Sequence, residues 1–371
     1  MRAIGIIFSN IHSDTIDELT HRRTLASVPF GGRYRLIDFA LSNMVNANIT
    51  KIGVIAKRNY QSLMDHIGSG KDWDLSRRNG GVTVFPPFGN YRSDTLYANR
   101  LEALKSIMGF ITKAHEEQVL MVDCDSVNVV DYADVLRQHS ETNADITIVY
   151  QKGIVTEDLR IHMGLKVKED GQLTSASLTS EVGKEGLFSL NAWVINRRLL
   201  YSLIDEAIAH GATDFERDII LPNIKSLRIF GYHHEGIYLH ISTLANYFAN
   251  NMKLLNKDVR EQLFEQKNRL IYTKVRDSAP TKYGSHAEIE NSFIADGCLI
   301  EGKVIDSILF RGVKVGKNTV VKDSIIMQDT ITGENVYLNC VIADKNVTIR
   351  DRHHLSGCPA IPYYIGKNIM I

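Results

Sequence analysis

The chain has 371 residues, of which 44% are apolar and 23% charged, and this length suits two globular domains. Lys plus Arg equals Asp plus Glu at 43 each, so the zero net charge argues against electrostatic binding to nucleic acid or to a membrane surface. No apolar run approaches the roughly 20 residues that cross a bilayer. The four cysteines are scattered and form no CxxC pair, which predicts reduced, mostly packed thiols in a cytoplasmic protein.

In the first two-thirds of the chain, apolar strands alternate with helical patterns. In chain order they are strand Ala3–Phe8, helix Asp38–Asn48, strand Lys51–Ala56, helix Tyr60–Ile67, strand Val119–Val122, helix Val135–Glu141 and strand Ala144–Tyr150. This order predicts an α/β domain whose mostly parallel, Rossmann-like sheet is covered by helices on both faces. Ligands of such sheets bind at the carboxyl ends of the strands. We therefore expect the chemistry in the loops after Ile7, Ala56 and Val122.

From about Lys282 the helical period disappears and short aliphatic positions recur every five or six residues. They include Ile294, Ile300, Val315, Val321, Ile325, Ile331 and Val336. Turn formers such as Gly316–Lys317–Asn318 stand between them, and this period is typical of a parallel β-helix. A β-sandwich is the alternative, but its strands recur at about 8–12 residues. We predict one domain over residues 1–256, a linker over 257–281 and a β-helix over 282–371.

The segment Val28–Asn43 reads VPFGGRYRLIDFALSN. It resembles the VPFGG-(K/R)-YR-(I/L)-IDF-x-LSN signature of the ADP-glucose pyrophosphorylases, which are glucose-1-phosphate adenylyltransferases. Further landmarks agree in order: Leu19–Thr20, Tyr60–Ile67, Ile271–Thr273 and Asp323–Met327. The resemblance covers nearly the whole chain. It implies a nucleotidyltransferase domain followed by a left-handed parallel β-helix.

The family's reaction joins glucose 1-phosphate to ATP and releases diphosphate, so the protein must cradle the triphosphate, hold Mg²⁺ and clamp the sugar phosphate. The cradle is a glycine-rich loop in the family, because glycine lets backbone N–H groups approach the phosphates. The matching stretch, Ser9–Ile16, contains no glycine. Thr15 replaces the family's arginine, and Asp14 adds a negative charge. The sequence therefore predicts that this cradle is lost.

The two phosphate clamps are also replaced. The family's lysine for the reacting phosphates falls at Leu25, and an apolar side chain cannot supply its charge. The Glu–Lys pair of the sugar site falls at Leu178–Thr179. No match to the family's GTADA motif is present between Pro86 and Ala103.

The resemblance places the family's two metal-binding aspartates at Asp125, which is retained, and at His240, which replaces the second carboxylate. Mg²⁺ prefers oxygen ligands, so this pair is a poor magnesium site. Two ligands are also too few for a zinc site. We expect Asp123 and Asp125 to be solvated loop carboxylates, with no metal or cofactor in this chain. The Mg²⁺ of the reaction would then belong to a catalytic partner.

Folding motifs that remain without reacting residues predict a non-catalytic, regulatory subunit of the GlgD type. The resemblance implies a hetero-oligomer with a catalytic ADP-glucose pyrophosphorylase subunit, and tetramers are the form that the family adopts. Two alternatives stay open. One is a weakly active adenylyltransferase with an altered site. The other is an unrelated binding or acyl-transfer role for the β-helix, with His353 or His354 as its base.

Four arginines lie close together in the sequence: Arg22, Arg23, Arg33 and Arg35. The resemblance places the family's effector-binding basic residues in this region, and arginine binds phosphate in a bidentate manner. We predict that they bind a phosphorylated small molecule, which could be a sugar phosphate, a nucleotide or inorganic phosphate. The alternatives are a solvated basic surface, or internal salt bridges with Asp38 and other nearby carboxylates.

Overall fold

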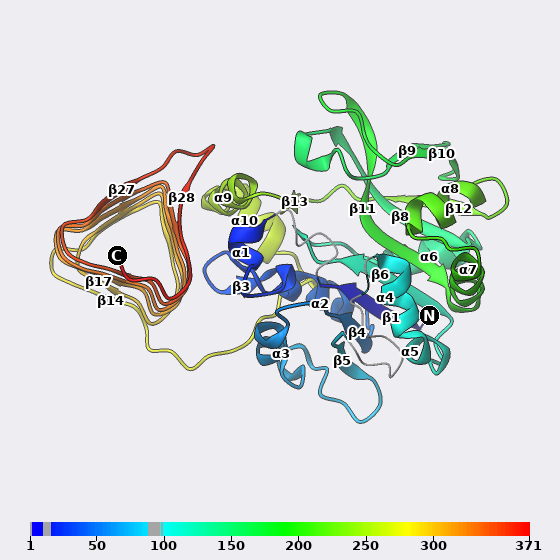
Figure 1. Ribbon diagram of the computed structural model, residues 1–371, viewed down its shortest axis with the longest axis horizontal. Coiled ribbons are helices and arrows are strands. Elements are labelled where there is room, and N and C mark those ends of the chain that lie inside the picture. The colour runs from blue at the N-terminus through cyan, green and yellow to red at the C-terminus, as the bar shows by residue number, and fades with distance from the viewer. Residues whose placement is uncertain (1, 10–15, 88–96, 98) are drawn as a thin grey trace.

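The computed structural model describes residues 2–9, 16–87, 97 and 99–371. Figure 1 shows two bodies: a sheet domain covered by helices, and a β-helix seen down its axis as a triangle. They lie against each other along α1 (Asp17–Thr20), α9 (Leu244–Met252) and α10 (Lys257–Phe264). Within the described residues, no helix has the length and apolar character that crossing a bilayer requires.

The first domain is built on a nine-stranded mixed sheet. Its central path runs β10-β9-β11-β6-β1-β4-β5, and β8 joins β11 to β12. The strands are β1 (Ala3–Phe8), β4 (Lys51–Ile55), β5 (Gly81–Phe85), β6 (Gln118–Asp123), β8 (Ile146–Ile154), β9 (Gly164–Val167), β10 (Leu173–Ser177), β11 (Glu185–Asn196) and β12 (Ile229–His233). Strands β6, β1, β4 and β5 pair in parallel, whereas β11 is antiparallel to β6. The mostly parallel sheet predicted from the alternation is confirmed, with an antiparallel extension on the β11 side.

Helices flank both faces of this sheet (Figure 1). Besides α1, α9 and α10 they are α2 (Leu36–Asn46), α3 (Gln61–Ile67), α4 (Arg100–Ser106), α5 (Met108–Thr112), α6 (Tyr132–Glu141), α7 (Arg197–Ala209) and α8 (Leu221–Asn223). Short 3₁₀ turns are η2 (Leu25–Ser27), η3 (Lys71–Trp73), η4 (Glu157–Leu159) and η6 (Lys253–Leu255), and one π turn is η5 (Glu216–Ile220). The predicted strand Ala3–Phe8 is reproduced to the residue, and the other predicted elements of this domain are found within a few residues of their expected ends.

The second domain is a left-handed parallel β-helix made of three five-stranded parallel sheets. The first sheet holds β14 (Lys282–Tyr283), β17 (Leu299–Ile300), β20 (Lys314–Val315), β23 (Ile331–Thr332) and β26 (Thr348–Ile349). The second holds β15 (Glu288–Glu290), β18 (Lys303–Ile305), β21 (Val320–Lys322), β24 (Tyr337–Asn339) and β27 (His354–Ser356). The third holds β16 (Phe293–Ile294), β19 (Ile308–Leu309), β22 (Ile325–Ile326), β25 (Val341–Ala343) and β28 (Tyr363–Ile365). The in-register stacking of aliphatic residues fills its core, as the hexapeptide period predicts.

The predicted linker over residues 257–281 is not all extended chain. It begins with α10, which buries Leu263 against the first domain. The Phe264 ring stacks on Tyr34 at a centroid distance of 5.0 Å, and Tyr34 belongs to the hairpin of β2 (Pro29–Phe30) and β3 (Tyr34–Arg35). Residues 265–281 then run to the β-helix without regular structure. The helical start of the predicted linker, Lys257–Phe264, therefore belongs to the sheet domain.

Polar contacts join the two domains. Arg23 donates two hydrogen bonds, of 2.7 and 2.6 Å, to the carboxylate of Asp344 in the β-helix. The hydroxyl of Tyr364 donates to the backbone carbonyl of Glu18 at 2.6 Å. Both partners of the Arg23–Asp344 pair are almost fully buried. A buried ion pair of this kind fixes the relative orientation of the domains, because separating them would leave two unpaired charges.

Candidate functional site

The two family metal positions lie together at the carboxyl end of the parallel sheet. Asp125 follows β6, and the next residues form β7 (Ser126–Asn128), which pairs with β13 (Tyr238–His240). The backbone N–H of Ile241 donates to the carbonyl of Asp125 at 2.7 Å. This small antiparallel ladder brings His240 beside Asp125, as the family resemblance predicts.

His240 sits between two carboxylates. Its Nε2 lies 3.4 Å from Asp125 Oδ2, and its Nδ1 lies 3.7 Å from Oδ2 of Asp158 in η4. Burial opposes charge on the ring, but the two flanking carboxylates of Asp125 and Asp158 prevail and raise the pKa of His240 to about 9. At neutral pH the ring is therefore an imidazolium, held where the family places a metal site.

These residues do not fit Mg²⁺. A divalent cation would have to lie beside the imidazolium charge and would find only Asp125 of the family's aspartate pair. Among the described residues, no group of three or more His, Cys, Asp or Glu side chains is arranged to hold a metal ion. The expectation that Asp125 is a solvated carboxylate is wrong: its side chain is 2% exposed and is paired with His240. The reason is that a fixed protein cation compensates its burial.

Two members of this cluster were not found from the sequence. Asp158 provides the second carboxylate, and the His162 ring packs edge-on to His240 at a centroid distance of 4.5 Å. His162 is fixed in turn, because its Nδ1 pairs with the Ser189 carbonyl at 2.8 Å. Neither residue lies in a family motif. The replacement of a metal aspartate by histidine was a signal to look for a second carboxylate, but the sequence does not say which one.

The other acidic-loop carboxylate, Asp123, is also buried rather than solvated, which corrects the second half of that expectation. Its Oδ2 accepts a 2.6 Å hydrogen bond from Arg100, and the same guanidinium pairs with Glu216. The guanidinium also lies 4.5 Å from the ring centroid of Trp193. Asp123 thus takes part in a buried structural network with its charge balanced within the chain.

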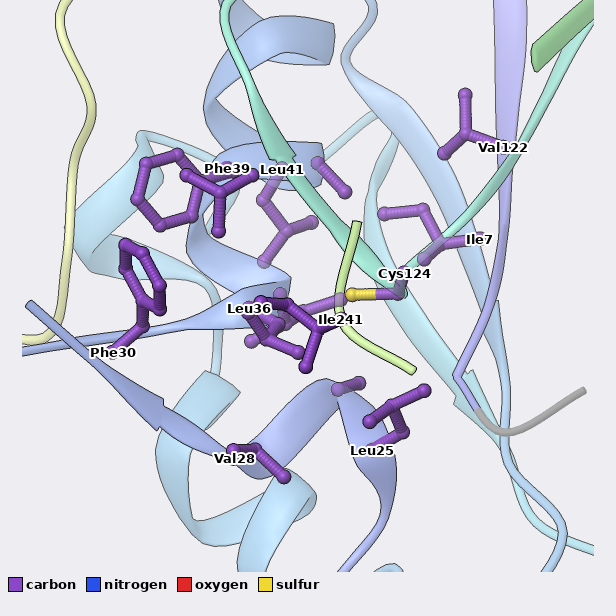
Figure 2. Close-up of a cluster of buried hydrophobic side chains, with 14 of the residues drawn as sticks. Ile7, Leu25, Val28, Phe30, Leu36, Phe39, Leu41, Val122, Cys124 and Ile241 are labelled. Carbon is purple, nitrogen blue, oxygen red and sulfur yellow. The ribbon is translucent and has the colours of Figure 1, made fainter. Parts of the chain in front are cut away.

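The position of the family's phosphate lysine has become part of the hydrophobic core. Leu25 is 2% exposed, and Figure 2 shows it in the same cluster as Val28, Cys124 and Ile241. Its neighbours come from several elements, so a charged side chain here would be desolvated without a partner. The structure therefore explains how the chain tolerates leucine at this position: its side chain packs in the same core cluster as Ile241, the residue that follows β13.

Two further positions of the predicted loss are the sugar-site pair and the phosphate loop. Leu178, at the family's sugar-site glutamate position, is exposed at the end of β10, and Thr179 beside it is exposed as well. The glycine-free loop falls on residues 10–15, outside the described residues, as does most of the segment between Pro86 and Ala103.

The four predicted effector arginines do not converge on one point. Arg23 is 4% exposed and is committed to Asp344, so its assignment as a free effector ligand is wrong, although it satisfies the salt-bridge alternative. Arg22 is exposed and lines a wide pocket between α1 and the last coil of the β-helix, which also contains Lys367. Arg33 and Arg35 line a different cavity. Arg22 and Arg23 are adjacent in the sequence, yet Arg22 is exposed and Arg23 is buried.

The cavity that contains Arg33 and Arg35 lies between the domains and has a volume of about 30 Å³. We call it the basic cavity. Among the residues that the structure describes, six Lys or Arg side chains line it and no carboxylate does; the six are Arg33, Arg35, Lys274, Arg276, Arg311 and Lys345. Only some of these charges are balanced elsewhere: Arg311 Nε, for example, donates to Asp296 Oδ1 at 3.0 Å.

Arg35 is held in the basic cavity by uncharged oxygens. Its Nη1 donates to the carbonyl and to the hydroxyl of Ser62, at 2.7 and 3.0 Å. Burial lowers its pKa to about 10, with Asp38 opposing and Arg23 and Arg276 assisting, so it stays charged at neutral pH. Asp38 itself lies 2.5 Å from His66 Nε2 and accepts the Arg35 backbone N–H. The predicted Arg–Asp38 salt bridge is thus replaced by a His66–Asp38 pair.

Comparisons with known proteins agree with both domains. The nucleotidyl transferase family matches residues 15–160, and the GlmU-like C-terminal hexapeptide family matches residues 278–357. The glycogen biosynthesis protein GlgD of Bacillus subtilis is 32% identical over 99% of this chain and 96% of its own length. In Geobacillus stearothermophilus, a GlgD protein (33%) and a glucose-1-phosphate adenylyltransferase (32%) each match 86% of this chain and 83% of their own lengths. The chain therefore belongs to the ADP-glucose pyrophosphorylase family of glycogen biosynthesis, which includes both GlgD proteins and glucose-1-phosphate adenylyltransferases.

Proposed function

We propose that this chain is a non-catalytic, regulatory subunit of ADP-glucose pyrophosphorylase. The observation that carries the proposal is the position of the His240 ring, which lies between Asp125 and Asp158 where the resemblance puts a metal site. Nucleotidyl transfer needs a cation that is free to bind the phosphate oxygens of ATP. Here the cation belongs to the protein and is already neutralised by carboxylates, so it cannot do this work.

The other losses act in the same direction. Leu25 provides no charge to the reacting phosphates, and Leu178–Thr179 provides neither charge of the sugar-site pair. Each lost electrostatic contact costs roughly 2–4 kcal/mol in the transition state. Three such losses together slow the reaction by about four orders of magnitude or more. A weakly active adenylyltransferase remains the second candidate, and direct assay decides between them.

A catalytic partner follows from this role. We propose a hetero-oligomer, a tetramer, with an active glucose-1-phosphate adenylyltransferase of the same organism. That Geobacillus stearothermophilus contains relatives with both names supports such a pairing. Identity alone does not separate the two classes, since both relatives are about equally similar, so the argument depends on the site residues. The free cysteines, three of them buried, suit a reducing compartment, and we place the complex in the cytoplasm.

The regulatory site of this proposal is the basic cavity. Cations that are held together without carboxylates repel one another, and an anion relieves that repulsion. Four of the lining side chains are guanidinium donors with the planar geometry that suits a phosphate group, and Arg33 and Arg35 are two of them. A volume of about 30 Å³ leaves no room for a whole nucleotide, so only the phosphate end of a ligand would enter the cavity. We therefore propose that the phosphate of a small effector, or inorganic phosphate itself, binds there.

The decisive experiment measures ADP-glucose synthesis by this chain alone, by the catalytic partner alone, and by the two co-expressed and co-purified. We expect negligible activity from the first, and a changed rate or effector response in the third relative to the second. A substantial rate from this chain alone would instead support the weakly active enzyme. Co-expression that yields no complex and no change in rate would contradict the regulatory role.

The effector site is tested in the co-purified complex with the double substitution of Arg33 and Arg35 to Gln. We expect the phosphate dose–response to shift to higher concentration by about tenfold or more, because each charge-assisted hydrogen bond contributes roughly 1.5–3 kcal/mol. Arg22→Gln is the matched control, since it removes an exposed arginine from the neighbouring pocket. An unchanged dose–response in the double variant, with the complex intact, would end the effector proposal for this cavity.

A further inference from the structure

Lys345 occupies a position in the basic cavity that differs from that of the other cations. It follows Asp344 in the turn after β25, and its backbone N–H donates to Asp344 Oδ1 at 2.6 Å. The Asp344 carboxylate is already engaged: Arg23 donates to both of its oxygens, and the Tyr364 hydroxyl, whose one proton is shared with the Glu18 carbonyl, lies 2.9 Å from Oδ2. The carboxylate of the adjacent Asp344 therefore already has other hydrogen-bond donors and does not pair with the Lys345 side chain.

The Lys345 amine has no hydrogen-bond acceptor or ion-pair partner among the described residues. Lys274, which lines the same cavity, donates to the carbonyl of Asp65. Burial, followed by repulsion from Arg35, Arg23 and Arg276, lowers the pKa of Lys345 to about 6, with Asp344 opposing. At neutral pH most molecules then carry an uncharged, nucleophilic amine at this position.

The surroundings of this amine favour a negative charge on it. Arg33, Arg35 and Arg276 line the same cavity and carry charges that no carboxylate in the lining balances. Lys274 and Arg311 add further positive potential, and His66 adds none, because burial lowers its pKa below the usual value. A reaction that converts the neutral amine into an anion would therefore be driven forward by electrostatic stabilisation of the product.

We propose that Lys345 is a carbamylation site, where the amine adds carbon dioxide and the surrounding cations hold the carbamate formed. The nitrogen lone pair attacks the carbon of CO₂, and a nitrogen–carbon bond forms. The electrons of one carbon–oxygen π bond move to oxygen, and one N–H proton leaves to solvent. The product is a carbamate anion, so no oxidant or further co-reactant is required. The regulatory consequence rests on the proposed function: the carbamate and an effector phosphate would occupy the same cations, so CO₂ would weaken phosphate binding.

The experiment uses the whole protein with ¹³C-enriched bicarbonate and CO₂ at pH 7.4, free of phosphate. Carbamate is detected by ¹³C NMR, then trapped by alkylation and located by mass spectrometry. We expect carbamate on Lys345 at an occupancy at least about tenfold above that of any other lysine, since an ordinary lysine with a pKa near 10.4 is almost entirely protonated there. Lys345→Arg should abolish the signal, because it replaces the nucleophilic amine with a guanidinium of similar length. Lys274→Arg is the matched control and should retain it.

Two outcomes overturn the inference: no carbamate on Lys345 of the wild-type protein, or a signal of equal size in Lys345→Arg. Phosphate titration, run with and without CO₂, separates this inference from the proposed function. Phosphate that binds while no carbamate forms sinks the carbamylation alone. A carbamate on Lys345 that phosphate does not displace upholds the modification and contradicts the cavity's role as a phosphate site.

Discussion

The metal position and the basic cavity treat buried charge in opposite ways. At the metal position, each charge has a partner within the chain: His240 pairs with Asp125 and Asp158, and Arg100 with Asp123 and Glu216. In the basic cavity, six Lys and Arg side chains face a space that no described carboxylate lines. The first arrangement is self-sufficient, whereas the second is electrostatically incomplete.

The difference matters because the same family scaffold supports both regions. Buried charges without partners are costly, so a chain that has no use for a site gains stability by pairing its charges internally. The retained imbalance of the basic cavity is therefore the stronger indication of a ligand. Substitutions can disrupt the internal charge pairing at the metal position, or can add a carboxylate that pairs a charge in the basic cavity.

The largest expected effect is on catalysis. The purified chain should form ADP-glucose from Mg²⁺-ATP and glucose 1-phosphate at least about four orders of magnitude more slowly than a common enzyme turnover of about 10 s⁻¹. His240→Asp should not restore activity, because Leu25 and Leu178–Thr179 still lack the phosphate and sugar clamps. A direct assay of diphosphate release measures both proteins. A wild-type turnover near 10 s⁻¹ would contradict the inference that the internal charge pairing at the metal position marks a lost catalytic function.

The same variant provides a readout that does not depend on activity. His240→Asp removes the imidazolium and places a carboxylate beside Asp125 and Asp158. Three neighbouring carboxylates repel one another, so the variant should be less stable than the wild type when a chelator removes all metal. Mg²⁺ should then raise the melting temperature of the variant and leave that of the wild type unchanged, because oxygen ligands suit Mg²⁺. Equal responses of the two proteins would show that His240 does not replace the metal.

The second effect concerns the Arg23–Asp344 pair between the domains. Asp344→Ala should lower the free energy of unfolding by about 3–5 kcal/mol, because it leaves the Arg23 guanidinium buried without its counter-charge. Denaturant unfolding measures the change. Glu290→Ala, on an exposed face of the β-helix, is the control and should change it by less than about 0.5 kcal/mol. An Asp344→Ala protein as stable as the control variant would mean that the pair does not join the domains.

Sequence patterns predicted the fold well because they are local. The alternation of strands and helices gave the sheet domain, and the five- or six-residue period gave the β-helix. The start of the linker was missed because α10 is stabilised by burial of Leu263 against the first domain, which is a tertiary contact.

The sites were predicted only in part, for the same reason. Motif positions identified Leu25 and His240, since each replaces a residue of known chemistry. The partners Asp158 and Asp344 lie far from these motifs in the sequence, and only the folded chain brings them into contact. Arg22 and Arg23 are neighbours in the sequence yet differ completely in burial, which depends on how the β-helix docks.

The third effect is a pH dependence of stability at the metal position. The pKa of His240 is raised to about 9 in the folded protein and is about 6.5 in an unfolded chain. Its contribution, on the order of 3 kcal/mol, is therefore fully present below about pH 6.5 and is lost as the pH rises toward 9. The stability difference between wild type and His240→Asn should shrink over this interval. A pH-independent difference for His240→Asn would contradict the imidazolium.

The smallest effect tests the basic cavity through Ser62. Ser62→Ala removes the hydroxyl that accepts from Arg35 Nη1 but keeps the backbone carbonyl acceptor at 2.7 Å. Stability should fall by only about 0.5–1.5 kcal/mol, and phosphate affinity, measured by calorimetry, should change by less than about tenfold. Ser62→Asp should instead weaken phosphate binding well beyond the alanine variant without destabilising the fold, because its carboxylate gives Arg35 the internal partner that His240 has in Asp125. If Ser62→Asp bound phosphate as tightly as Ser62→Ala, the unpaired charge of Arg35 would not be what attracts the anion.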